Sequence, residues 1–138
     1  MVQHVIRAGS RVSIRSGAPW EPLVGYARAV RVGSFVAVSG TAAVGPDGTV
    51  TGGSDAYRQA QRCIEVIRDA LEKAGAGLEH VVRTRIFVTD IDQWEDIARA
   101  HREAFGAVPP ATSMVEVTRL IDPAMLVEIE ADAIVVAE

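Results

Sequence analysis

The sequence predicts a single α+β domain in which two helices cover one face of a mixed β-sheet. Its 138 residues are enough for one hydrophobic core without disulfides or metals. Short apolar runs typical of strands stand before, between and after two longer segments in which apolar residues recur at helical spacing. The resulting order is β-β-α-β-α-β-β, and no repeat or long linker divides residues 1–138.

The first forty residues contain four short apolar runs that are candidate strands: 2–6, 12–14, 29–32 and 35–38. Gly33 and Ser34 separate the last two runs, and a two-residue connection containing glycine is typical of a β-hairpin. Residues 17–22 are predicted to form a loop, because their two prolines lack a backbone donor and restrict their neighbours.

The first predicted helix begins after Ser54, a plausible N-cap, and ends at Gly75 and Gly77. Its apolar stripe consists of Tyr57, Ala60, Ile64, Ile67 and Leu71. The second helix begins at 90–92 and ends before Gly106. Its predicted inner face consists of Trp94, Ile97, His101 and Phe105. Strands are expected at 81–88, 113–120 and 126–136.

The last two strands have one aliphatic face and one acidic face. We expect the helices to cover the aliphatic residues Val115, Val117, Val127, Ile129, Ala131 and Ala133. The opposite face would carry Met114, Glu116, Thr118, Leu126, Glu128, Glu130, Asp132 and Ile134. This face is too polar for a dry core and too apolar for a plain surface. A wet cavity against another subunit fits both properties, so the sequence favours a homo-oligomer.

Composition excludes several classes of function. A formal net charge of −4 argues against binding nucleic acid through phosphate contacts. Cys63 is the only cysteine and no apolar stretch is long enough to span a membrane, so we expect a cytoplasmic protein. The chain has no P-loop, no GxGxxG, no HExxH and no GxSxG, and its three histidines lack ligand-like spacing. We therefore expect no metal or organic cofactor.

Glu128 is the strongest candidate for a catalytic residue. A glutamate flanked by apolar residues in a strand can have its pKa raised by desolvation, as a general acid or base requires. A glutamate satisfied by an interface arginine or by water explains the residue equally well. Ser39-Gly40 follows an apolar strand, where a glycine lets a ligand approach the backbone. Arg28 is a candidate for binding an anion or for pairing with a surface carboxylate.

Five blocks of the chain resemble the RidA (YjgF) family of reactive-intermediate deaminases. In order, they are GYARAV (25–30), FVAVSG (35–40), VRTRIFVTD (82–90), PATS (110–113) and VEIEA (127–131). The resemblance implies a chorismate-mutase-like fold that assembles as a homotrimer around a β-barrel, with ligand clefts between subunits. It also implies hydrolysis of 2-imino or enamine acids to 2-keto acids and ammonia without a cofactor.

Carried over by position, the resemblance assigns roles to individual residues. Glu128 would orient or activate the attacking water, Tyr26 would line the cleft, and Ser39 and Gly40 would form part of its wall. The backbone at Met114 would contact the ligand. Active deaminases have an arginine for the substrate carboxylate where this chain has Thr112, which can donate only one neutral hydrogen bond.

Three hypotheses follow from this departure. The first is a RidA-like hydrolase acting on another imine or enamine, weak or inactive on 2-iminopropanoate. The second is a non-catalytic trimer that binds a small metabolite. The third is a structural or regulatory oligomer with a vestigial cleft. Of these, the hydrolase is slightly favoured over the binder.

Overall fold

The computed structural model describes residues 5–136, which form one seven-stranded sheet and three α-helices. The strands are β1 (Val5–Ala8), β2 (Arg11–Ile14), β3 (Ala29–Val32), β4 (Phe35–Ala42), β5 (Val81–Val88), β6 (Ala111–Glu116) and β7 (Val127–Ile134). The helices are α1 (Trp20–Val24), α2 (Ala56–Lys73) and α3 (Trp94–Phe105), with short 3-10 turns η1 (Leu78–His80) and η2 (Ile91–Gln93). The predicted α+β class is confirmed.

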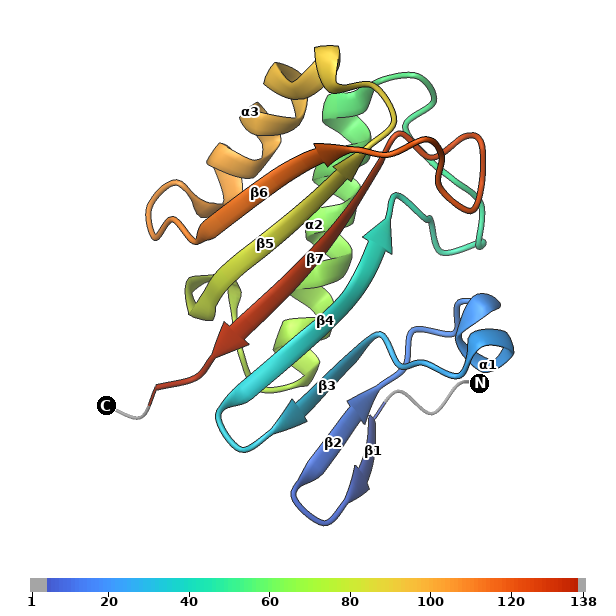
Figure 1. Cartoon of the computed structure of the whole chain (residues 1–138). Coiled ribbons are helices and arrows are strands. Elements are labelled where there is room, and N and C mark those ends of the chain that lie inside the picture. The colour runs from blue at the N-terminus through green and yellow to red at the C-terminus, as the bar shows by residue number, and fades with distance from the viewer. Residues whose placement is uncertain (1–4, 137–138) are drawn as a thin grey trace.

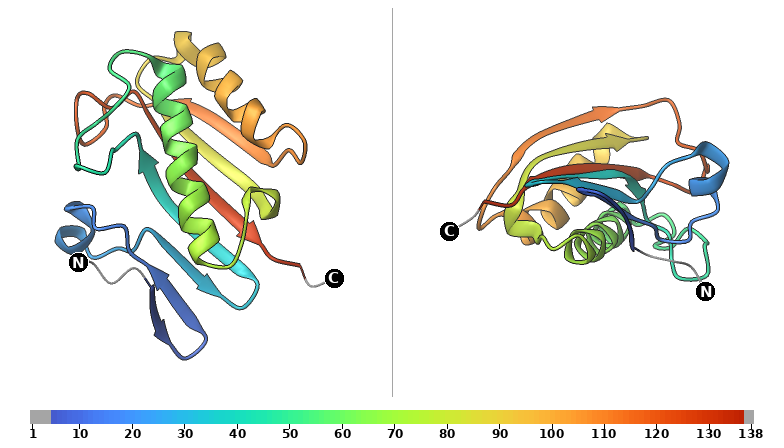
Figure 2. Two further views of the ribbon diagram at one scale, coloured as in Figure 1. Left: turned by 180° about the vertical axis from the view of Figure 1, so that it is seen from behind. Right: turned by 90° about the horizontal axis from the view of Figure 1, so that it is seen from below.

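The sheet runs in the order β1-β2-β3-β4-β7-β5-β6. Every neighbouring pair is antiparallel except β5 and β6, which are parallel and are connected through α3. Helices α2 and α3 lie on the same face of the sheet, as the views in Figures 1 and 2 show. No helix in the described part of the chain is long and apolar enough to cross a membrane.

The core lies between the two long helices and the centre of the sheet. Its members on β7 are the predicted set, Val127, Ile129, Ala131 and Ala133, all fully buried. They face α2, whose predicted stripe is buried apart from Tyr57, which packs at its margin. Strict alternation along β7 therefore identified correctly which residues face the helices.

The ends of α2 differ slightly from the prediction. Asp55, rather than Ser54, is the N-cap, and its side chain accepts a hydrogen bond from the backbone N–H of Arg58 at 3.1 Å. An aspartate in this position satisfies one of the orphan donors of the first turn. Gly75 adopts φ +79°, a left-handed conformation that favours glycine, just beyond the end of the helix.

Two predictions about helices were wrong. Residues 17–22 are not entirely loop, because α1 begins at Trp20; Pro22 falls in its first turn, where no backbone donor is needed. Trp94 is 51% exposed and does not belong to the inner face of α3. It opens the helix, and the preceding η2 turn inserts Ile91 against the core instead. Ile97, His101 and Phe105 do face inward.

The predicted faces of β6 were also wrong. In the parallel pairing, Met114 lies beside Ile86 on the helix-covered face, where it packs against the core. Val115 lies beside Phe87 on the opposite face and is 47% exposed. β6 ends at Glu116, so Val117 lies beyond the strand. The register with β5, which the sequence of β6 alone does not reveal, sets which residues face inward.

The face of the sheet that the helices leave uncovered carries both charged and apolar side chains. Phe35 and Ile134 are direct cross-strand partners on this face and are 45% and 40% exposed. Arg85 lies on the same face, within 3.1 Å of Asp132 and 3.6 Å of Glu130. The mixture agrees with the sequence analysis. That a second copy covers this face stays a prediction.

Candidate functional site

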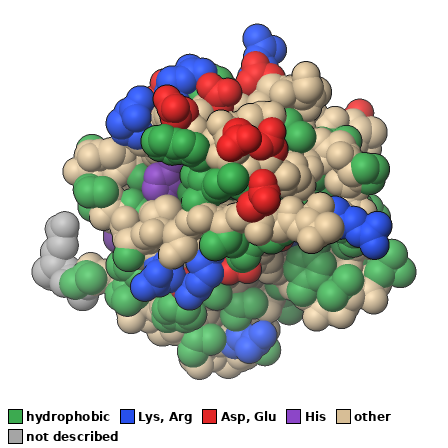
Figure 3. Space-filling view, turned by 45° about the horizontal axis from the view of Figure 1, so that its top comes forward, with side chains coloured by type: hydrophobic (Ala, Val, Ile, Leu, Met, Phe, Trp, Pro, Cys, Tyr) green, Lys and Arg blue, Asp and Glu red, His purple; other side chains and the backbone are tan. Residues whose placement is uncertain are grey.

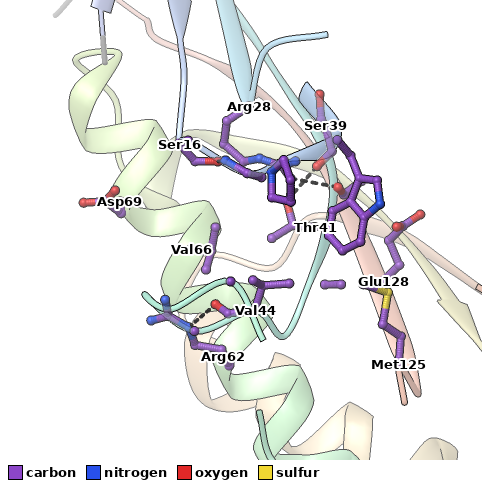
Figure 4. Close-up of a pocket in the computed structure, with 18 of the residues that line it drawn as sticks. Ser16, Arg28, Ser39, Thr41, Val44, Arg62, Val66, Asp69, Met125 and Glu128 are labelled. Atoms are coloured by element: carbon purple, nitrogen blue, oxygen red, sulfur yellow. Dashed lines mark hydrogen bonds between the residues drawn. The ribbon is translucent and has the colours of Figure 1, made fainter. Parts of the chain in front are cut away.

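A cleft of about 1200 Å³ opens at one end of the sheet, between β4, β7, α1 and α2. Four of the six predicted site residues line it, Tyr26, Ser39, Gly40 and Glu128. In Figure 4, Arg28, Ser39 and Thr41 gather on one side of this cleft, while Arg62, Val66 and Asp69 approach from α2. The cleft thus joins residues that lie about a hundred positions apart in the sequence.

An irregularity in β4 shapes the floor of the cleft. Val38 pairs with Ala131 and Thr41 with Ile129, so β4 advances three residues while β7 advances two. This extra residue is a β-bulge, and it falls at Ser39 and Gly40. Hydrogen bonds hold the bulge: the Ser39 hydroxyl donates to the Ala27 carbonyl at 2.6 Å, and the Thr41 hydroxyl donates to the Ser39 carbonyl at 2.7 Å.

Arg28 is buried beside the bulge, with only 6% of its surface exposed. Its Nη1 donates to the Gly40 carbonyl at 2.8 Å and to the Thr41 hydroxyl at 2.9 Å. Its Nη2 donates to the Tyr26 hydroxyl at 3.1 Å. Arg28 therefore ties together the bulge and the side chain of Tyr26, and it places a positive charge in the wall of the cleft.

Glu21 balances the charge of Arg28. Its carboxylate lies 3.8 Å from Nε of Arg28, and Glu21 is only 3% exposed. The backbone N–H of Ser16 donates to the same carboxylate at 3.1 Å, and the Ser16 hydroxyl donates to it as well. No local sequence pattern marks Glu21 as buried, because it follows Trp20 in a segment that is predicted to be loop.

Glu128 projects from β7 toward the bulge and is half-buried. A Cβ atom at position 40 would stand 2.8 Å from its Oε2, so any side chain there would push the Glu128 carboxyl group out of its present position. Burial raises the pKa of Glu128 above its ordinary value of 4.5, the neighbouring Glu130 raises it further, and Arg28 partly offsets both. A carboxyl group in a cleft whose pKa is raised by burial is a candidate for proton transfer.

Because the pKa of Glu128 is raised in the folded protein, the free energy of unfolding depends on pH. The folded protein holds this proton more tightly than the unfolded chain, whose carboxyl titrates near 4.5. The resulting stabilisation is complete below that pH and is lost as the pH rises through the raised pKa. We expect Glu128→Gln to gain thermal stability relative to the natural protein as the pH rises from about 4 to about 8, measured by thermal unfolding. A difference in Tm that does not change with pH would contradict the assignment.

The rest of the cleft has one apolar wall and one charged wall. Trp20, Val24, Ile121 and Met125 contribute apolar surface. The opposite wall is the side of α2 that carries Arg62, Glu65, Val66, Asp69 and Lys73. The Arg62 Nε donates to the Val44 carbonyl at 2.9 Å, which fixes the loop after β4 against the helix.

Thr112 and Met114 do not line this cleft within one chain. The Thr112 hydroxyl lies 2.8 Å from the hydroxyl of Thr84, which in turn lies 2.8 Å from Nε2 of His101. Burial lowers the pKa of His101 below its ordinary value, so the ring is neutral at pH 7. This chain of hydrogen bonds links α3 to β6, which is an edge strand of the sheet. A contribution of Thr112 and Met114 to a ligand site requires a second copy of the chain.

Cys63 has no features of a nucleophile. It is fully buried on α2, its thiol lies 3.8 Å from the Val127 carbonyl, and burial raises its pKa strongly. Among the described residues, no group of three or more His, Cys, Asp or Glu side chains is arranged to hold a metal ion.

Comparisons with known proteins agree with the fold and with the sequence blocks. Residues 17–135 match the family described as Endoribonuclease L-PSP. A protein of Streptomyces coelicolor is 37% identical over 120 residues, covering 87% of this chain and 89% of that protein. A RutC family protein of Pyrococcus abyssi is 36% identical over 114 residues, covering 82% and 88%.

Solved structures give the same result. A crystal structure from Mycobacterium tuberculosis, described as a member of the YjgF/YER057c/UK114 family, is 49% identical, with a TM-score of 0.83 over 91% of this chain and all of that one. The YjgF gene product of Escherichia coli is 30% identical, with a TM-score of 0.73 over 79% of this chain and 87% of that one. The chain therefore belongs to the YjgF/RidA family.

Proposed function

We propose that this protein is a hydrolytic deaminase of a small imine or enamine and that it acts as a homotrimer. The observation that carries the proposal is Glu128, a half-buried carboxyl group with a raised pKa in the wall of the cleft. Tyr26, Ser39 and Gly40 share that cleft. Membership in the YjgF/RidA family supports the same chemistry.

In the proposed reaction, Glu128 moves protons in two directions. The substrate reacts as the protonated imine: the Glu128 carboxylate accepts a proton from water while the water oxygen attacks the carbon of the protonated C=N bond, which yields a neutral carbinolamine. The protonated Glu128 then returns that proton to the amine nitrogen, and its carboxylate accepts the hydroxyl proton as the C–N bond breaks and the carbonyl compound and ammonia form. Transfer of this last proton to the departing ammonia gives ammonium and restores the carboxylate, so water is the only other reactant and atoms and charge balance.

A second subunit would complete the cleft. β6 is an edge strand that carries Thr112 and Met114, and the uncovered face of the sheet exposes apolar side chains such as Phe35. Exposed apolar surface on a sheet is typical of a face that packs against another subunit. In the proposed trimer, Thr112 and the backbone of Met114 from one copy would approach the Glu128 cleft of the next.

Cleavage of RNA, which the family description suggests, is less well supported. The protein carries a net charge of −4, and the side chains that line the cleft include more carboxylates than cations. On the face shown in Figure 3, basic side chains form separate small groups rather than a continuous band. An acidic cleft repels a phosphate backbone, whereas it accommodates a neutral or positively charged imine.

The test is ammonia release from a panel of freshly generated imines and enamines, with the natural protein and with Glu128→Gln. We expect the substitution to reduce kcat by about 100- to 10,000-fold, the contribution of a positioned general acid or base. Glu95→Gln is the matched control, because Glu95 is an exposed glutamate in the first turn of α3 and does not line the cleft. Equal activity of the natural protein and Glu128→Gln, with unchanged oligomeric mass, would refute the proposed function.

A further inference from the structure

The side chains that line the cleft have an excess of negative charge. Five are acidic and three are basic, namely Asp47, Glu65, Asp69, Glu128 and Glu130 against Arg28, Arg62 and Lys73. A ligand with a carboxylate would add another negative charge to this set. The excess therefore favours ligands that are neutral or positively charged.

Each of the three cations already has a carboxylate partner within the described chain. Arg28 is paired with buried Glu21 at 3.8 Å. Arg62 lies 3.3 Å from Glu65, and Lys73 lies 2.8 Å from Asp69. The two pairs on α2 are solvent-exposed and easily broken. The Arg28 pair is not, because separating it would leave a buried carboxylate without a counter-charge.

The hydrogen bonds of Arg28 show what kind of group it can still bind. Both hydrogens of Nη1 are used, by Gly40 and Thr41, and one hydrogen of Nη2 is used by Tyr26. Nε faces the carboxylate of Glu21. One N–H of Nη2 is left without an acceptor among the described residues. A carboxylate bound in the forked manner needs two parallel donors, whereas a carbonyl oxygen needs one.

We propose that the cleft selects a neutral or cationic imine that carries a carbonyl group, such as an imino amide or imino ester, instead of a 2-imino carboxylate. Arg28 is the residue that determines this specificity, and the remaining N–H of its Nη2 donates to the carbonyl oxygen. The ionised form of Glu128, across the bulge from Arg28, repels a carboxylate and stabilises a protonated C=N group. The proposal rests on the deaminase function argued above.

The direct test compares the binding of two stable, nearly isosteric compounds, pyruvamide and pyruvate, to the natural protein at pH 7.5. Calorimetry or ligand-observed NMR measures both dissociation constants, and no turnover is needed. We expect pyruvamide to bind at least about tenfold more tightly than pyruvate, since the anion meets one donor and a repelling carboxylate. Equal or tighter binding of pyruvate, or no binding of either compound, overturns the proposal.

Arg28→Lys then tests the assigned residue. Lysine keeps the positive charge beside Glu21 but lacks the fork that reaches several acceptors, so pyruvamide should bind about tenfold more weakly. Arg58→Lys is the matched control, because Arg58 is an exposed arginine of α2 outside the cleft. Equal effects of the two substitutions on pyruvamide binding remove Arg28 from the proposal. If Arg28→Lys does not fold, the comparison of the two ligands on the natural protein still decides the proposal.

The two proposals fail in different ways. If Glu128→Gln leaves ammonia release unchanged, the deaminase function is wrong whatever the ligand preference. If the protein hydrolyses imino acids faster than imino amides in a manner that depends on Glu128, the deaminase function holds and the inference about charge is wrong.

Discussion

Replacing Thr112 with arginine is expected to raise turnover of 2-iminopropanoate by about 30- to 5000-fold. A forked, charge-assisted contact to the substrate carboxylate is worth about 2–5 kcal/mol in a buried site, and threonine cannot supply it. The measurement is the rate of ammonia release from freshly generated 2-iminopropanoate by the natural protein and by the variant. The same substitution should shift the ligand preference from pyruvamide toward pyruvate.

The structure allows this substitution with little cost to stability. Thr112 lies exposed at the start of the edge strand β6, and the substitution removes its hydrogen bond to Thr84 at 2.8 Å and a long one to the Pro110 carbonyl at 3.4 Å. Thr84 keeps its contact with His101, so we expect a loss of about 1 kcal/mol in the free energy of unfolding. Ser113→Arg is the control, because Ser113 is adjacent in the strand and faces the opposite side of the sheet. Equal rates for the two variants would mean that Thr112 is not the position that holds the carboxylate.

Glu21→Ala is expected to lower the free energy of unfolding by about 3–5 kcal/mol, the cost of leaving a buried charge unpaired. Glu21 is the counter-charge of buried Arg28 and also accepts hydrogen bonds from Ser16. Chemical denaturation measures the loss. The variant should also bind pyruvamide more weakly, since Arg28 and the bulge at Gly40 lose their support.

Glu65→Ala provides the comparison for this large effect. Glu65 forms an ion pair of shorter distance, 3.3 Å to Arg62, but its side chain is 57% exposed. Exposed pairs contribute about 0–1 kcal/mol, because water screens the charges and the side chains lose freedom on pairing. A similar loss in both variants would mean that Glu21 acts through something other than its buried pairing with Arg28.

Strict patterns in the sequence predicted the parts of the fold that depend on local order. The alternation of β7 identified its buried face, and the bounds of β5 (Val81–Val88) were predicted to the residue. The stripe of α2 identified its inner face for the same reason. These predictions succeed because burial there repeats with the period of the element itself.

The incorrect predictions concern features that depend on distant partners. Met114 and Val115 were assigned to the wrong faces, because the parallel pairing with β5 sets the register of β6. Trp94 is exposed, and the partly buried Ile91 of the preceding η2 turn packs against the core instead. The sequence predicted Glu128 as a site residue but not Glu21, whose burial results from contact with Arg28 and Ser16. Composition alone left the role of Arg28 open, since it depends on the acceptors around it.

The bulge in β4 has a consequence for how such a cleft can change over evolutionary time. The shape of the bulge is set mainly by the backbone. It depends on the offset between β4 and β7 and on the backbone carbonyl groups of Ala27, Ser39 and Gly40, which accept hydrogen bonds. Substitutions on the surrounding elements alter charge and size without disturbing that offset. The residue at position 112, or the apolar residues of the rim, can therefore change during evolution while the backbone of the cleft floor keeps its shape. The same fold can then bind a different substrate.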